Sequence, residues 1–150
     1  MQLSDRVRVV DIQDLVDIGG TDIHNGVAAA NWINMALYDR ILFVVEVGPT
    51  WNAADQLDDL HVNQANTAVG GGTKALIPAV NIDQIVANVT GQRYGLEVTA
   101  AHCDTENGFH WVRLECAEAG NTGTDEVRAT AICYGARFQN DNLSGFTQLA

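Results

Sequence analysis

The stretch Arg40 to Val47, RILFVVEV, decides the fold class of this chain. Every second position holds a large apolar residue, namely Ile41, Phe43, Val45 and Val47. Two of the intervening positions, Leu42 and Val44, are apolar as well. Apolar residues on both faces are typical of a strand that is buried on two sides, and Gly48-Pro49 ends it. We therefore expect residues 40–47 to form a central strand of a β-sheet.

Three later segments have the strict alternation of half-buried strands: 96–101, 110–117 and 127–134. The segment 110–117, for example, places Val112, Leu114 and Cys116 on one face and Trp111, Arg113 and Glu115 on the other. Turn-forming residues separate the three segments, with DTENG at 104–108 and GNTGTD at 120–125. These signals predict a three-stranded antiparallel meander from Leu96 to Tyr134, whose last two strands form a hairpin.

The remaining segments have weaker patterns. Arg6 to Ile12 could form an edge strand or an extended arm, and Trp32 to Leu37 suits a short strand. Asp59 to Gln64 alternates like a strand but also fits helical spacing. Ile82, Ile85, Val86 and Val89 have helical spacing, which predicts one short helix capped by Asn81.

Together these segments predict a mainly β chain, an antiparallel β-sandwich or barrel-like module with at most one short helix. A chain of 150 residues that is 47% hydrophobic can bury a core as one domain, 1–150. Residues 1–26 and 138–150 are expected to be extended terminal arms. The glycine-containing stretches 18–30 and 69–73 are expected to be loops.

The charge balance argues against two classes of partner. The chain carries 19 acidic residues against 8 basic ones, which gives a formal net charge of −11. Nucleic-acid binding needs clustered Lys and Arg, whereas the single lysine and seven arginines are scattered along this sequence. A negative field also opposes an anionic lipid surface. We expect neither nucleic acid nor a membrane as a partner.

Cysteine usage favours a reducing assembly compartment over the alternative of a secreted, disulfide-bonded domain. Cys103, Cys116 and Cys133 cannot all pair within the chain, and none forms a C-x-x-C motif. A cysteine in a strand-like run is usually a small buried hydrophobic residue. The longest apolar stretch, Ile41 to Val45, is too short to span a bilayer.

No motif in the sequence predicts an enzyme, a cofactor or a metal site. Gly70 to Lys74 departs from a phosphate-binding loop, because Thr73 precedes the lysine and Pro78 follows closely. His102 and Cys103 are adjacent, so in a strand they point to opposite faces, although His102 could approach His110 across the predicted hairpin. The acidic pairs Asp58-Asp59 and Asp125-Glu126 diverge in the same way and suit solvated charge.

Four residues are the candidates for contact with a partner. Trp51 follows Gly48-Pro49-Thr50 in a predicted loop, where an exposed aromatic side chain suits an interface or a sugar. Arg6 and Arg8 lie in the predicted N-terminal arm, and Phe146 lies in the predicted tail. The other two tryptophans, Trp32 and Trp111, are expected to be buried in the core.

The order of motifs resembles a protein family. Its elements are YDRILFVV at 38–45, NQA at 63–65, KAL at 74–76, LEV at 96–98, GFHWVR at 108–113 and AICYGA at 131–136. This pattern, over residues 35–137, is similar to capsid decoration (cement) proteins of tailed bacteriophages with HK97-type heads. The resemblance implies a β-rich module that binds the major capsid protein on the capsid exterior and trimerises at local three-fold sites. It implies no catalytic residue.

The leading hypothesis is therefore a virion structural protein, assembled in the host cytoplasm, that stabilises an icosahedral phage head. A tail tube or head–tail joining protein is the first alternative. A carbohydrate-binding β-sandwich that uses Trp51 and loop carboxylates is the second.

Overall fold

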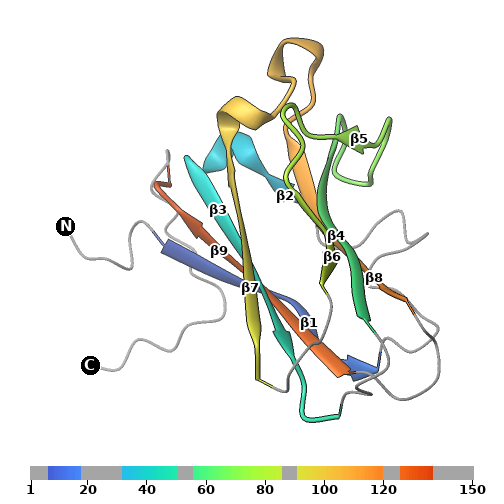
Figure 1. Ribbon diagram of the computed structural model, residues 1–150. Helices are drawn as coiled ribbons and strands as arrows, with labels where there is room; N and C mark the ends of the chain where they lie inside the picture. Colours follow the sequence, from blue (N-terminus) through green and yellow to red (C-terminus); the bar gives the residue numbers. More distant parts are fainter. Residues whose placement is uncertain (1–6, 18–31, 51–55, 86–90, 120–125, 137–150) are drawn as a thin grey trace, which may run out of the picture.

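Two antiparallel β-sheets form the part of the chain that the computed structural model describes, which is residues 7–17, 32–50, 56–85, 91–119 and 126–136 (Figure 1). The first sheet has four strands in the order β1-β9-β3-β7. Their bounds are Val7–Asp17 for β1, Glu126–Tyr134 for β9, Arg40–Val47 for β3 and Arg93–Thr99 for β7. The predicted mainly β, antiparallel fold is confirmed.

The second sheet has the order β2-β8-β4-β5, and β6 pairs with the other half of β4. Its strands are Ile33–Asn34 (β2), Trp111–Ala119 (β8), Gln56–Ala65 (β4), Lys74–Ala75 (β5) and Asn81–Ile85 (β6). Within the described ranges, three single 3-10 turns lie between strands, at Met35–Leu37, Ala100–His102 and Thr105–Asn107.

Strand β3 lies at the centre of the first sheet, as its sequence predicts. It pairs with β9 along one edge and with β7 along the other, and both pairings are antiparallel. Its inward residues are fully buried, whereas the outward residues Leu42 and Val44 are only half-buried. The prediction that β3 is buried on both faces is therefore wrong, because the second sheet covers only one face of this strand.

The hydrophobic core lies between the two sheets. The inward side chains of both sheets belong to one cluster, which includes Phe43, Val45, Leu96, Val98, Ala129, Ala131, Leu57, Leu60, Val62, Val112 and Leu114. All three cysteines are buried reduced thiols, and burial raises the pKa of Cys103 to about 11. Trp32 is buried as expected, but Trp111 is only half-buried.

The predicted meander from Leu96 to Tyr134 is wrong. Strand β7 pairs with β3, β8 pairs with β2 and β4, and β9 pairs with β1 and β3, so consecutive strands lie in opposite sheets. The alternation correctly located the three strands but carries no information about which strand lies alongside. Asn107-Gly108 does not make a hairpin: Gly108, at a φ of 82°, ends the 3-10 turn Thr105–Asn107 instead.

The predicted helix after Asn81 is also wrong. Residues 81–85 form β6, in which Ile82 pairs with Leu60 of β4, and residues 86–90 lie outside the described part of the chain. A few apolar residues fit a strand or a helix equally well, and the unpaired edge of β4 favours the strand. For 59–64 the strand alternative is correct, since this segment lies within β4.

The N-terminal segment forms an edge strand over 7–17, one of the two alternatives that its sequence left open. The other parts of the predicted arms, 1–6, 18–26 and 138–150, lie outside the described residues.

Candidate interaction surface

The outward face of the first sheet has an apolar middle. The register aligns Val9, Ile132 and Leu42 in one row across β1, β9 and β3. The next row holds Thr130, Val44 and Gly95 on β9, β3 and β7. Val9 and Gly95 are exposed, and the other four residues are half-buried. The apolar strip of Val9, Ile132, Leu42 and Val44 thus crosses β1, β9 and β3 on their outward side. The same two rows also hold Thr130 of β9, Glu97 of β7 and, at the β1 position that pairs with Thr130, Asp11.

One end of this face carries a polar cluster around Arg40. The Arg40 guanidinium donates a hydrogen bond from Nη1 to Oε1 of Glu97 at 3.1 Å, across β3 and β7. Tyr134 of β9 is the register partner of Arg40 on the other side. Burial raises the pKa of Tyr134, and the neighbouring Glu97 carboxylate raises it further. The phenol therefore stays neutral beside this ion pair.

The other end of the face has a second cluster. Arg128 of β9, Glu46 of β3 and Arg93 of β7 form one row across three strands. Arg93 Nε donates to Glu46 Oε2 at 2.6 Å. This hydrogen bond, helped by the charges of both arginines, lowers the pKa of Glu46. One carboxylate thus lies between two guanidinium groups, and Glu126, two residues before Arg128 on β9, adds a second carboxylate at this end.

These arginines are the exposed cations of the described chain. Arg40, Arg93 and Arg128 are all exposed and all on this outward face. The two other cations whose side chains the structure describes, Lys74 and Arg113, are half-buried and buried, respectively, and lie elsewhere. Among the cations whose side chains the structure describes, the exposed ones therefore all lie on one sheet face, in a protein with a net charge of −11.

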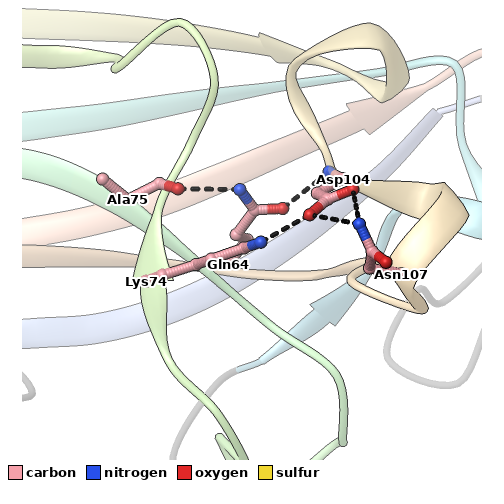
Figure 2. A network of polar contacts seen from close by, with 5 residues as sticks. All are labelled: Gln64, Lys74, Ala75, Asp104 and Asn107. Atoms are coloured by element: carbon pink, nitrogen blue, oxygen red, sulfur yellow. Dashed lines mark hydrogen bonds and ion pairs between the residues drawn. The ribbon is translucent and has the colours of Figure 1, made fainter.

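A second polar network ties together the loops beside β5 (Figure 2). Gln64 at the end of β4 is fully buried, and both ends of its amide are used. Its Nε2 donates to the Ala75 carbonyl at 2.7 Å, while its Oε1 accepts from the Asp104 backbone N–H at 2.8 Å. One side chain therefore links strand β5 to the connection between β7 and β8.

Lys74 and Asp104 complete this network. Lys74 Nζ lies 2.5 Å from Asp104 Oδ2 and 3.8 Å from the centroid of the Phe109 ring. The Lys74 hydrogen bond lowers the pKa of Asp104, with a further contribution from Asn107. The lysine that follows the glycine loop is thus engaged by a carboxylate and an aromatic face. This arrangement holds the loops in place.

The outward face of the second sheet carries a buried ion pair. Arg113 of β8 donates from Nε to Glu115 Oε1 at 3.1 Å and lies over the Trp32 ring at 4.6 Å. His61 Nε2 lies 3.3 Å from Glu115 Oε2, and Asn63 Nδ2 lies 3.2 Å from the same histidine nitrogen. Burial raises the pKa of Glu115, but hydrogen bonds from His61, Arg113 and Asn63 together bring it down to about 2.

The structure does not test whether the four predicted contact residues bind a partner. Trp51, Arg6 and Phe146 lie outside the described residues. Arg8 belongs to β1 in register with Cys133, but its side chain is also outside what the structure describes. Sequence reasoning missed Arg40, Arg93 and Arg128 because they are far apart in the chain. The available signal was that Arg40 and Arg128 each lie within a predicted strand.

The histidines and carboxylates form no metal site among the described residues. The predicted approach of His102 to His110 depended on a hairpin that does not form. Instead, His102 Nδ1 accepts a hydrogen bond from the Thr99 backbone N–H at 3.1 Å. Within the described ranges, the structure also contains no helix of the length and apolarity needed to cross a membrane.

In comparisons with known proteins, the sequence matches no family model and no curated protein, and the fold matches no solved structure.

Proposed function

We propose that this protein is a virion structural protein, a capsid decoration protein that binds the outer surface of an icosahedral phage head and stabilises it. The observation that carries the proposal is the outward face of the β1-β9-β3-β7 sheet, with its apolar strip between two arginine-bearing ends. The motif order of residues 35–137 supports the same class of protein.

This face has the composition of a protein-binding surface. Protein interfaces commonly combine an apolar centre with a polar rim, and arginine is enriched in them. Here Leu42, Val44 and Ile132 supply the centre, while the Arg40 and Arg93 clusters supply the rim. A sheet also presents such groups with little conformational freedom left to lose on binding.

The hydrogen-bonded loops beside β5 suit a protein that binds its partner as a rigid body. Gln64, Lys74 and Asp104 hold the β5 region against the connection between β7 and β8 (Figure 2). A decoration protein stabilises a shell by binding the assembled lattice and not its separate subunits. Many modest contacts repeated over the lattice add up to a large stabilisation.

The partners in this proposal are the major capsid protein and other copies of this chain, as a homotrimer at three-fold positions. Trp51, Arg6, Arg8 and Phe146 remain predicted contacts of the same assembly.

The test is sedimentation with expanded shells assembled from the phage's major capsid protein. We expect saturable binding with a fixed number of copies per shell, and decorated shells that resist higher temperatures than bare ones. Protein sedimented without shells is the control for self-association. Failure to co-sediment would overturn the proposal. Polymerisation into stacked rings under the electron microscope would assign the chain to tail tubes instead. Glycan binding that Trp51→Ala abolishes would assign it to carbohydrate recognition.

A further inference from the structure

We infer that strand β7 is an edge through which two copies of this chain associate. It pairs antiparallel with β7 of a second copy, in the register that sets Arg93 opposite Glu97 of that copy. The two four-stranded sheets then form one continuous sheet across a two-fold axis at Gly95. The inference goes beyond the proposed function and does not depend on it. A two-fold contact is also separate from the three-fold contact of the proposed trimer.

The first argument is that β7 is the longest regular edge among the described strands. Within the described ranges, β7 pairs with β3 only, and this pairing runs through all seven residues of β7 without a register shift (Figure 1). The opposite edge of the same sheet, β1, has two register shifts. In the second sheet, the edge strands β2 and β5 have two residues each and β6 has five. Short strands and bulges protect an edge from pairing with another chain, and β7 uses neither from Arg93 to Thr99.

The second argument is the direction of the backbone groups along β7. The Val47 N–H donates to the Gln92 carbonyl at 2.9 Å, so Gln92 faces β3. Backbone groups alternate in direction along an antiparallel strand, so the next residue and every second one after it face away from β3. These residues are Arg93, Gly95, Glu97 and Thr99. Their N–H and C=O groups therefore point to the side of β7 on which a second copy would add its strand.

Both ends of this edge are closed within the chain. At one end, the Thr99 N–H donates to His102 Nδ1 at 3.1 Å. At the other end, Gly91, at a φ of 78°, donates to the Val47 carbonyl at 2.8 Å, so that residues 91 and 92 form a bulge opposite Val47. The open part of the edge is therefore 93–97, and its midpoint is Gly95. Two copies that both use this open part fully must pair about a two-fold axis at Gly95.

The third argument is that the charges on this edge complement one another in the same register. A two-fold axis at Gly95 places Arg93 of each copy directly opposite Glu97 of the other, and these side chains are 68% and 46% exposed. Opposite charges at directly paired positions stabilise an antiparallel pair, whereas like charges destabilise it. A register moved by four residues in either direction sets two arginines or two glutamates opposite each other, and one moved by two residues removes the ion pairs. Hydrogen bonding and charge thus select one register.

The ion pairs within each copy are compatible with this contact. Arg93 donates to Glu46 through Nε, and a guanidinium group has further N–H donors on its two Nη atoms. Glu97 is hydrogen-bonded to Arg40 and Tyr134, and a carboxylate has about four acceptor sites. Each of the two groups can therefore keep its partner on β3 and gain one across the contact. Pairing places guanidinium and carboxylate groups alternately across the joined sheets.

The experiment exchanges the charges across the contact. Arg93→Glu and Glu97→Arg each set like charges opposite one another in a pair of identical chains, but a mixture of the two variants again sets opposite charges at both positions. We expect each variant alone to associate at least tenfold more weakly than wild type, and the mixture to return to within threefold of it, measured by sedimentation velocity over a concentration series. The controls Arg128→Glu and Glu106→Arg make the same charge changes at exposed positions away from this edge and should stay within threefold.

Amide hydrogen exchange measures the contact residue by residue. In wild type, the N–H groups of Arg93, Gly95 and Glu97 should exchange more slowly as the protein concentration rises, because pairing removes them from water. The Arg93→Glu variant alone should not show this slowing. If either variant does not show the circular dichroism spectrum of wild type, the exchange measurement on wild type decides by itself.

Three results would overturn the inference. The first is wild-type protein that stays monomeric up to about 1 mM. The second is an oligomer in which the three β7 amides exchange at the rate of the monomer, which would assign the assembly to another surface. The third is a mixture that associates no better than the separate variants, which would rule out this register. All three measurements use the purified chain without capsid shells, so they leave the proposed function to its own test.

Discussion

The two outward sheet faces each carry an arginine–glutamate pair, but in opposite surroundings. On the first sheet, Arg40 and Glu97 have side chains that are 57% and 46% exposed. On the second sheet, Arg113 and Glu115 have side chains that are 7% and 17% exposed, and the Trp32 ring lies against the guanidinium. The same chemical pair is thus solvated on one face and largely removed from water on the other.

This difference separates a structural role from a binding role. A buried charge has lost its hydration, so removing its partner leaves a large uncompensated cost. An exposed charge keeps most of its hydration and can change partners freely. Arg113 is therefore committed to the fold, whereas Arg40 is available to another molecule. The following predictions test this contrast between Arg113 and Arg40.

The largest effect is expected from Arg113→Ala. The substitution leaves the Glu115 carboxylate half-buried without its guanidinium partner and removes the contact with Trp32. We expect the free energy of unfolding to fall by about 3–5 kcal/mol, measured by urea denaturation. Arg40→Ala on the other face is the matched control and should cost less than about 1 kcal/mol. Equal losses in the two variants would contradict the contrast between the faces.

Acid should lower the free energy of unfolding through protonation of Glu115. Its folded pKa of about 2 lies below the ordinary value of 4.5, so the ionised form stabilises the fold. This contribution is complete above pH 4.5 and is lost as the pH falls toward 2. We expect a loss of about 2–3 kcal/mol over this range, measured by denaturation at each pH. In Glu115→Gln the fall should be smaller than in wild type, while Glu46→Gln should retain most of it. An unchanged acid profile in Glu115→Gln would refute the assignment to this carboxylate.

The sequence predicted where the strands lie in the chain better than it predicted which strands pair with one another. The bounds of β3 match its apolar run residue for residue, because a strand with large side chains at every position needs a central place in a sheet. Alternation likewise located β8 and β9, but it could not show that they lie in different sheets. Pairing depends on contacts between residues far apart in the chain, for which a local pattern has no signal. The turn residues at 120–125 suit a connection between sheets as well as a hairpin.

The candidate surface was predictable only in part. Arg128 alternates with core residues in its strand, so its outward direction followed from the sequence. The pattern of residues 40–47 instead predicted burial on both faces, so the exposed position of Arg40 did not follow from it. Their position in a common face with Arg93 followed only from the order β9-β3-β7. The network of Gln64, Lys74 and Asp104 gave no signal, since its members are up to 40 residues apart and join through loops.

The smallest effect is expected from the exposed pair itself. A double-mutant cycle with Arg40→Ala and Glu97→Ala should give a coupling of less than about 1 kcal/mol in the free energy of unfolding. Because both side chains are solvated, the coupling should shrink further as salt is raised to about 1 M, where screening reaches about 3 Å. The Lys74–Asp104 pair, measured in the same way with Lys74→Met and Asp104→Asn, serves as the half-buried reference and should keep more of its coupling in salt. A coupling between Arg40 and Glu97 that is large and insensitive to salt would mean that this pair is fixed in the fold, and Arg40 would then not be available to a partner.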